Sequence, residues 1–206
     1  MGLKTFVKIS NVSNLSDARY CAGMGVHVMG FNIDPASDDK ISVDQFEAIT
    51  GWISGVEFAG ELKDSLPELD YLRKFPLDYV QIEQPEHLDV ISSYKIPVIM
   101  ALNIDKLQPM ETEKIIKKHA NKVAFFLIQA SDDGNCEHLH TSIYKLAQNY
   151  PLILGCGINK ENINTVIVNT SLKGIALKGS EELKPGFKDF DELADILETI
   201  EVEDNI

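Results

Sequence analysis

Two short stretches of this sequence read as buried strands that end in polar side chains of low acid–base reactivity. The first, residues 7–12, carries the hydroxyl of Ser10 near its end, and the second, residues 125–130, carries the neutral amide of Gln129 near its end. A serine hydroxyl acts as a base only when another group takes its proton, and an amide cannot give a proton to a reacting oxygen. We expect both side chains to face a ligand without transferring protons.

The elements that position these residues recur regularly along the chain. Runs rich in β-branched and aromatic residues predict eight strands, at 4–9, 26–33, 55–59, 78–82, 97–102, 122–129, 152–155 and 173–177. Helical periodicity lies between them, most clearly at 43–52, 110–119, 139–148 and 190–200, and Ser16 and Asp17 are the expected cap of the first helix.

Eight alternating strand–helix units predict a parallel sheet that closes into a (β/α)₈ TIM barrel, with 1–206 forming a single domain. A doubly wound open sheet is the alternative, but that fold usually has a glycine-rich first turn. In a TIM barrel the chemistry lies at the carboxyl ends of the strands. The polar residues expected there are Ser10, Asn11, Asp34, Glu61, Glu83, Gln84, Asn103, Asp105, Gln129, Asp132 and Asp133.

The last two strand ends have a different composition. Gly155, Cys156 and Gly157 follow the seventh predicted strand, and Lys178, Gly179 and Ser180 follow the eighth. Glycines let backbone N–H groups approach an anion closely, so these residues predict a phosphate site. Lys178 adds a positive charge to that site or is a solvent-exposed lysine of the rim. Cys156 is either a nucleophilic thiolate or, as we favour, a small packed side chain.

Composition limits the remaining classes of function. The formal net charge of −13 disfavours nucleic acid and anionic membranes as partners, and no apolar run approaches the length of a membrane span, so we expect a cytoplasmic protein. The three cysteines are widely spaced and are interpreted as reduced thiols. The five histidines form no metal-binding pair, and an acidic rim without a ligand is favoured over a divalent-cation site, so no metal or cofactor is predicted.

Several stretches together resemble one enzyme family. They are residues 7–18, 25–31 with Pro35 and Ser37, 80–82, 154–162 and 184–189, which follow in order over nearly the whole chain. The chain resembles phosphoribosylanthranilate isomerase, a TIM-barrel enzyme of tryptophan biosynthesis that performs an Amadori rearrangement on a phosphorylated aminosugar. The resemblance implies a phosphorylated small molecule as ligand, bound by the two glycine-rich strand ends and by a pocket that includes Asn11, Gln81, Glu83 and Asp132.

The resemblance also assigns roles to the two unreactive strand ends. The family's first strand ends in Lys-Ile-Cys-Gly, whose cysteine is the general base, and Ser10 stands at that position here. The family's sixth strand ends in an aspartate that is the general acid, and Gln129 stands there. The family's substrate-binding arginine after the second strand falls near Asp39 or Lys40. Both groups that transfer protons are therefore replaced.

Two functions remain open at this level. The first is an isomerase-like barrel with impaired catalysis that binds a phosphorylated metabolite or another enzyme of the pathway. The second is an active enzyme, on the same or another sugar phosphate, in which other groups have taken over; carboxylates such as Glu61, Glu83 or Asp132 are candidates for the acid. Self-association is a further open expectation, since the helix face around Ile115 and Ile116 reads either as an interface or as core packing.

Overall fold

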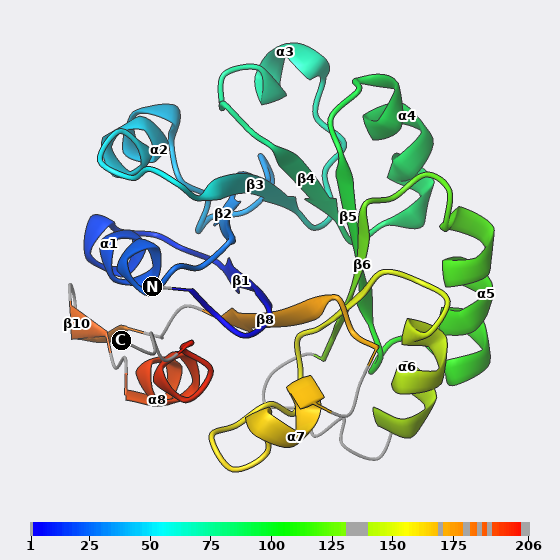
Figure 1. Ribbon diagram of the computed structural model, residues 1–206. Coiled ribbons are helices and arrows are strands. Elements are labelled where there is room, and N and C mark those ends of the chain that lie inside the picture. The colour runs from blue at the N-terminus through cyan, green and yellow to red at the C-terminus, as the bar shows by residue number, and fades with distance from the viewer. Residues whose placement is uncertain are drawn as a thin grey trace.

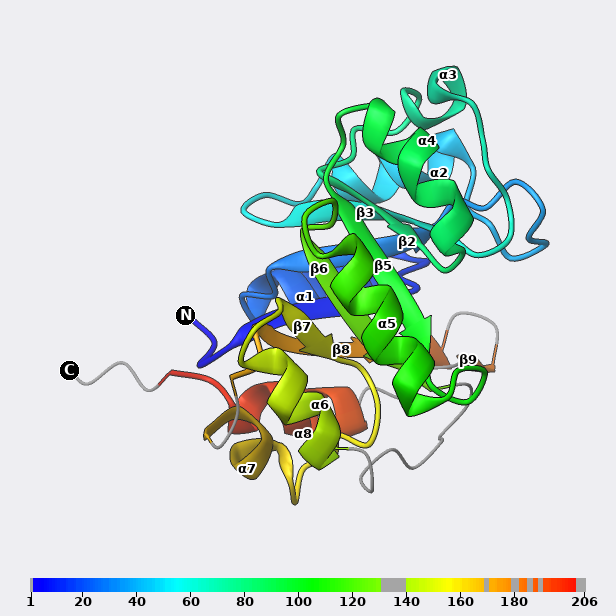
Figure 2. The ribbon, with the colours of Figure 1, turned by 90° about the vertical axis from the view of Figure 1, so that its right-hand side faces the viewer.

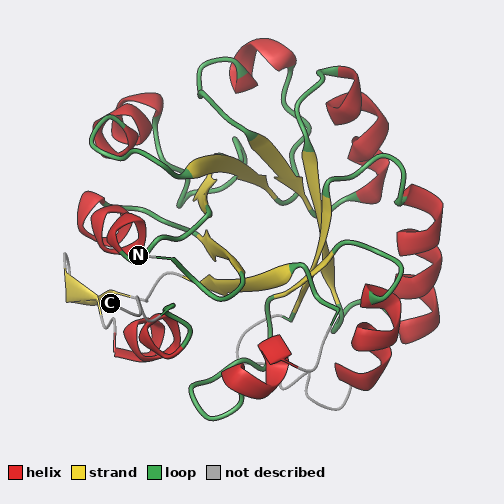
Figure 3. Ribbon diagram, viewed as in Figure 1, coloured by secondary structure: helices red, strands yellow, loops and turns green. Residues whose placement is uncertain are grey.

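A computed structural model of the chain describes residues 2–130, 140–168, 171–178, 182–184, 187–188 and 191–202. Within them, eight parallel strands form a closed barrel in the order of the sequence, β1 pairing with β8 (Figures 1 and 3). The strands are β1 Phe6–Ser10, β2 Val28–Asn32, β3 Glu57–Leu62, β4 Tyr79–Ile82, β5 Val98–Asn103, β6 Phe125–Gln129, β7 Leu152–Leu154 and β8 Gly174–Lys178. The predicted TIM barrel is confirmed.

Helices surround the barrel, and Figure 2 shows α5 and α6 on the outside of the strands. The helices are α1 Leu15–Gly23, α2 Val43–Thr50, α3 Leu69–Leu72, η1 Pro85–His87, α4 Leu88–Ser93, α5 Pro109–His119, α6 His140–Ala147, α7 Ile163–Val168 and α8 Asp191–Thr199. A short antiparallel hairpin of β9 Glu182–Lys184 and β10 Phe187–Lys188 precedes α8 and was not predicted.

Two details of the helices differ from expectation. The side chain of Asn14, rather than Ser16 or Asp17, caps α1 by accepting a hydrogen bond from the backbone N–H of Asp17. Ile116 of α5 is fully buried and Ile115 packs against the same core, so this face is core packing. None of the helices in the described ranges has the length and apolar composition needed to cross a bilayer.

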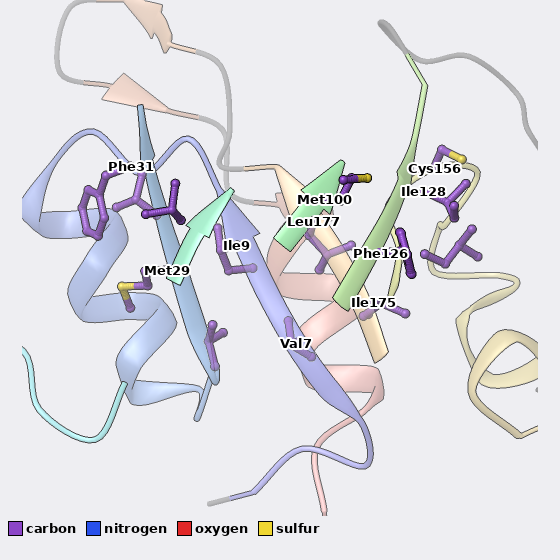
Figure 4. Packing of buried hydrophobic residues seen from close by; sticks show 14 of the residues in the cluster. Val7, Ile9, Met29, Phe31, Met100, Phe126, Ile128, Cys156, Ile175 and Leu177 are labelled. Atoms are coloured by element: carbon purple, nitrogen blue, oxygen red, sulfur yellow. The ribbon is translucent and has the colours of Figure 1, made fainter. Parts of the chain in front are cut away.

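Alternate residues of each strand face two different cores, as the pleat of a strand requires. The larger core lies between the strands and the helices and takes Val7 and Ile9 from β1 and Met29 and Phe31 from β2 (Figure 4). The smaller core fills the barrel itself with Val28, Ala59, Ile99, Ala101, Leu127, Ile153 and Ala176. Both faces of the strands are buried, which explains their nearly continuous apolar sequence.

Gly174 shows how tightly the barrel closes. It pairs with Phe6 between β8 and β1, and a methyl group at Gly174 would overlap the Phe6 carbonyl oxygen. We expect Gly174→Ala to lower the free energy of unfolding by about 1–3 kcal/mol, because backbone must move to admit the methyl group. Urea unfolding measures this. Gly23→Ala, at a helical position with no atom within 4 Å of the added carbon, is the matched control and should be neutral or slightly stabilising.

Candidate functional site

A ring of polar side chains lines the inner face of the barrel at the carboxyl ends of the strands. Because inward and outward residues alternate, the members of the inner core identify the next inward positions. These positions, which we call the barrel mouth, are Ser10, Asn32, Glu61, Glu83, Asn103, Gln129 and Lys178. The register makes Ser10 the neighbour of Lys178, Asn32 that of Glu61, and Asn103 that of Gln129. Ser10, Gln129 and Lys178 are the last residues of β1, β6 and β8, and Glu83 directly follows β4.

Below the mouth, a buried ion pair supports the end of β1. Lys8 has no exposed surface, and its ammonium group contacts the Oε1 atom of Glu61 on β3. The same ammonium group donates a hydrogen bond to Ser10 Oγ at 2.7 Å. Gly30 on β2 makes room for this arrangement, since a methyl group there would overlap Glu61 Oε1 and Lys8 Nζ. The Ser10 hydroxyl therefore lies against a cation.

Asn11 completes this cluster through its backbone. It has a φ of 58°, in the left-handed region, and its N–H donates to Glu61 Oε2 at 3.1 Å. Asparagine is one of the few residues besides glycine that tolerate this conformation, which accounts for its place after Ser10. With Lys8 on one oxygen and the Asn11 N–H on the other, the Glu61 carboxylate is held on both sides. The exposed Asn11 side chain lies at the rim.

On the opposite side of the mouth, Gln129 is linked to a carboxylate. Its Nε2 atom donates a hydrogen bond of 3.3 Å to Glu83 Oε1, at the end of β4. Glu83 is half-buried. The neutral amide predicted at this strand end therefore lies beside an acidic side chain that comes from another strand.

Gln81, one inward position below Glu83, adds a polar atom without a partner. The residue is 5% exposed, and its Oε1 atom accepts no hydrogen bond from the residues that the structure describes. A buried polar atom of this kind costs free energy unless a donor reaches it. Its place beneath the mouth makes it a candidate acceptor for a ligand's hydroxyl or N–H.

The strand ends predicted to bind phosphate are described only in part. The Gly155 N–H is already bonded to the Ile128 carbonyl oxygen at 2.7 Å, so it is not free for an anion. Gly157 has a φ of 63°, and its carbonyl oxygen accepts a hydrogen bond from Asn162. Lys178 is exposed at the end of β8. The other predicted residues, Gly179, Ser180 and the pocket residue Asp132, lie outside the described residues.

The prediction of three reduced thiols is wrong. Cys21 is a free, buried cysteine, and burial, followed by the nearby charge of Asp17, raises its pKa to about 12. Cys156 is disulfide-bonded. Residue spacing gave no sign of this bond, because nothing local in the sequence shows which thiols meet in space. Cys156 is 9% exposed, so its packed position agrees with the interpretation as a small buried side chain, although not as a thiol.

Asp34, expected on the catalytic face, instead joins two loops. Its carboxylate accepts hydrogen bonds from four backbone N–H groups, which belong to Ala36, Lys63, Asp64 and Ser65. Burial acts to raise the pKa of Asp34, but the hydrogen bonds from Ser65, Ala36 and Asp64 outweigh it and hold the pKa well below its ordinary value. Both oxygens are occupied, so Asp34 stabilises the loops after β2 and β3.

The Asp34 carboxylate makes the stability of the fold depend on pH. A pKa that is lower in the folded than in the unfolded state adds stability above the ordinary value of 3.8, and that stability is lost as the pH falls towards the folded-state pKa. We expect Asp34→Asn to lower the free energy of unfolding by about 2–4 kcal/mol at pH 7, because the NH₂ group of asparagine cannot accept hydrogen bonds from backbone N–H groups. The loss should be smaller below pH 3. Urea unfolding at pH 7 and below pH 3 tests this. Asp38→Asn, at an exposed position, is the control and should leave the free energy of unfolding unchanged at both pH values.

The sequence interpretation missed the part played by Lys8 and Glu61. A usable signal was present, since Lys8 lies between Val7 and Ile9 in a strand buried on both faces. A buried ammonium group needs a counter-charge, which pointed to an inward carboxylate on another strand. In the described part of the chain, no group of three or more His, Cys, Asp or Glu side chains is placed to hold a metal ion.

Comparison with known proteins supplies the family. The model of the family described as "N-(5'phosphoribosyl)anthranilate (PRA) isomerase" matches residues 8–199. This chain belongs to the phosphoribosylanthranilate isomerase family. Among curated relatives, the isomerase of Microcystis aeruginosa is 27% identical over 95% of this chain and 97% of its own length. That of Petrotoga mobilis is 27% identical over 89% of this chain and 90% of its own length.

Solved structures agree on the fold. The phosphoribosylanthranilate isomerase of Thermotoga maritima superposes with a TM-score of 0.78 and 23% identity over 95% of this chain and 98% of that chain. A second structure, described as a complex with reduced 1-(o-carboxyphenylamino)-1-deoxyribulose 5-phosphate, has a TM-score of 0.76 and 24% identity over the same shares. The family resemblance read from the sequence is confirmed.

Proposed function

We propose that this member of the isomerase family binds a phosphorylated aminosugar in the barrel mouth and lacks most or all of the isomerase turnover of a barrel with cysteine and aspartate at the two strand ends. The curated relatives that align with almost the whole chain are named N-(5'-phosphoribosyl)anthranilate isomerase. Their substrate is therefore the ligand to test first.

The observation that carries this proposal is the hydrogen bond from Lys8 to Ser10. The hydroxyl oxygen lies 2.7 Å from an ammonium group, which takes one of its lone pairs and cannot accept its proton, so this contact supplies no base to activate Ser10. Both oxygens of Glu61, the carboxylate in the same cluster, already accept hydrogen bonds, one from Lys8 and one from the Asn11 N–H. Neither side chain is arranged to remove a proton from a sugar carbon.

Binding of the ligand is supported by polar groups at the mouth and beneath it. Gln81 offers an unpartnered oxygen beneath the mouth, and Lys178 brings a positive charge to the end of β8, beside Ser10. We assign the phosphate to the region of Gly155, Cys156, Gly157, Lys178, Gly179 and Ser180, and the rest of the ligand to Asn11, Gln81, Glu83 and Asp132. Because the Gly155 N–H is already bonded, the later amides of this region are the proposed donors.

A second candidate is an active isomerase in which other groups have taken over proton transfer. The position of Glu83 beside Gln129 favours it for the acid, since the two side chains are hydrogen-bonded. No comparable group stands beside Ser10 in the described ranges, where the neighbours are Lys8 and the occupied Glu61. We therefore place impaired isomerisation first.

Two measurements on the unmodified protein test the proposal. Calorimetric titration with reduced 1-(o-carboxyphenylamino)-1-deoxyribulose 5-phosphate should show binding, and fluorescence should show little or no turnover of N-(5'-phosphoribosyl)anthranilate. Absence of binding at millimolar concentration contradicts the assignment of the mouth. Turnover as fast as that of a variant with both family residues restored contradicts the impairment and supports the second candidate.

Partners beyond the ligand are also a matter for experiment. One solved family structure is described as monomers made from the dimeric isomerase of Thermotoga maritima. We carry over self-association, or association with another enzyme of the pathway, as an expectation for this chain. Sedimentation analysis at micromolar concentration distinguishes monomer from dimer.

A further inference from the structure

We propose that Glu83 is the proton donor of this site, and that the chain opens the ring of a phosphorylated N-glycosylamine without completing its isomerisation. The inference rests on the proposed function, because it concerns the same bound aminosugar. The isomerisation has two steps, ring opening and removal of a proton from C2. The described side chains support the first step and not the second.

Glu83 is placed for this role by geometry. It occupies an inward position at the end of β4, and the Gln129 amide donates to its Oε1 atom at 3.3 Å. That neutral donor is the only hydrogen-bond partner of the Glu83 carboxylate among the described residues. The Gln129 amide occupies Oε1, and Oε2 has no hydrogen-bond donor among the described residues, so this oxygen is open to a ligand.

Two carboxylates at neighbouring strand ends, those of Glu61 and Asp34, differ from Glu83 in their hydrogen bonds. Glu61 contacts the Lys8 ammonium group and the Asn11 N–H, and Asp34 accepts four backbone N–H bonds. Hydrogen-bond donors therefore occupy both oxygens of Glu61 and both oxygens of Asp34. Of these three side chains, Glu83 alone lacks a cationic or main-chain donor within the described ranges, so the proton donor is assigned to it.

The supported step needs one proton. The Glu83 carboxyl group gives its proton to the ring oxygen while the bond between C1 and that oxygen breaks and the nitrogen lone pair forms a C=N bond. The product is an open-chain iminium ion with a hydroxyl group at C4, and Glu83 becomes a carboxylate. Reclosure on either face of the C=N bond returns the proton to Glu83 and gives either anomer, so atoms and charge balance.

The unsupported step is removal of a proton from C2. It needs a base, and the side chain at the end of β1 is a hydroxyl whose oxygen accepts a bond from the Lys8 ammonium group. Because the site has a proton donor, Glu83, but no base for C2, we expect exchange between anomers without net isomerisation. Such exchange is an activity distinct from the full rearrangement.

The test follows anomer exchange in N-(5'-phosphoribosyl)anthranilate by NMR saturation transfer between the two C1 protons. We expect the unmodified protein to raise the exchange rate above that in buffer, and Glu83→Gln to lower the enhancement about 100-fold. Glu86→Gln, an exposed carboxylate in η1 three residues later, is the matched control and should leave it unchanged. Gln129→Asp added to Glu83→Gln should restore exchange, because it places a second carboxyl group beside the lost one.

Deuterium incorporation at C2 in D₂O reports the second step, and we expect none with the unmodified protein. The inference is overturned if the ligand binds but exchanges as in buffer, if Glu83→Gln exchanges as fast as the parent, or if deuterium enters C2. Calorimetry on the same samples separates these results from failure of the proposed function, in which the ligand does not bind at all.

Discussion

Replacing Ser10 by cysteine and Gln129 by aspartate together is expected to raise isomerase turnover at least about 100-fold over the unmodified protein. Each proton-transfer group contributes typically about 10²–10⁴ in rate, and the parent has neither residue of the family pair. The surroundings suit a thiolate, because Lys8 Nζ lies 2.7 Å from Ser10 Oγ and a nearby ammonium group lowers the pKa of a thiol. The measurement is fluorescence turnover of N-(5'-phosphoribosyl)anthranilate.

The two single variants show how much each substitution contributes to the gain in turnover. If Glu83 donates the proton for ring opening, Ser10→Cys alone should produce most of the turnover, and Gln129→Asp alone should produce little. Ser10→Ala is the control for the shape of the site and should remain as slow as the parent. A double variant that binds the ligand but shows no gain would mean that the mouth holds the sugar in a different orientation, and the impairment would then not lie in these two residues.

Glu61→Gln is expected to be the most destabilising of the substitutions considered for this barrel. Lys8 has no exposed surface, so loss of the Glu61 charge leaves an ammonium group buried without a counter-charge. Breaking such a pair costs about 3–5 kcal/mol. For a chain of this length that lowers the melting temperature by roughly 10 °C. Thermal and urea unfolding monitored by circular dichroism give the value.

Two controls distinguish the buried charge from a general effect of substitution. Glu47→Gln, at an exposed position of α2, should change stability by less than about 0.5 kcal/mol. Lys8→Met combined with Glu61→Leu removes both charges and should recover most of the loss, since a buried ion pair is often replaceable by apolar side chains. A Glu61→Gln protein as stable as the parent would show that Lys8 does not depend on this carboxylate.

The proposed division of the reaction links these predictions to the fold. Gly30 is required on β2 because any larger side chain would overlap the Lys8–Glu61 pair, and the pair holds a cation against Ser10. The residues that stabilise the end of β1 therefore also set its chemistry. On the other side, Gln129 and Glu83 meet across the mouth from β6 and β4. At the end of β1, the ion pair that stabilises the barrel also surrounds Ser10. At the ends of β4 and β6, the Gln129–Glu83 hydrogen bond does not involve that pair.

Local pattern was sufficient for the eight barrel strands, although not for the β9–β10 hairpin. Apolar runs such as 97–102 predict strands because a strand buried on both faces has few polar positions, and β5 forms there. The alternation of strands and helices predicts the closed parallel barrel that the structure has. The assignment of the family's base and acid positions to Ser10 and Gln129 also uses only residue type and position, and it stays a prediction.

Tertiary structure decided what surrounds those residues. Lys8 and Glu61 are 53 positions apart and Gln129 and Glu83 are 46 apart, so no local pattern relates them. Asp34 could be read from sequence as a free carboxylate, and only its four N–H partners from two loops show that it is occupied. The sequence by itself determined which groups reach the mouth. The closure and register of the barrel determined which of them touch, because contacts between strands depend on distances that the order of residues does not contain.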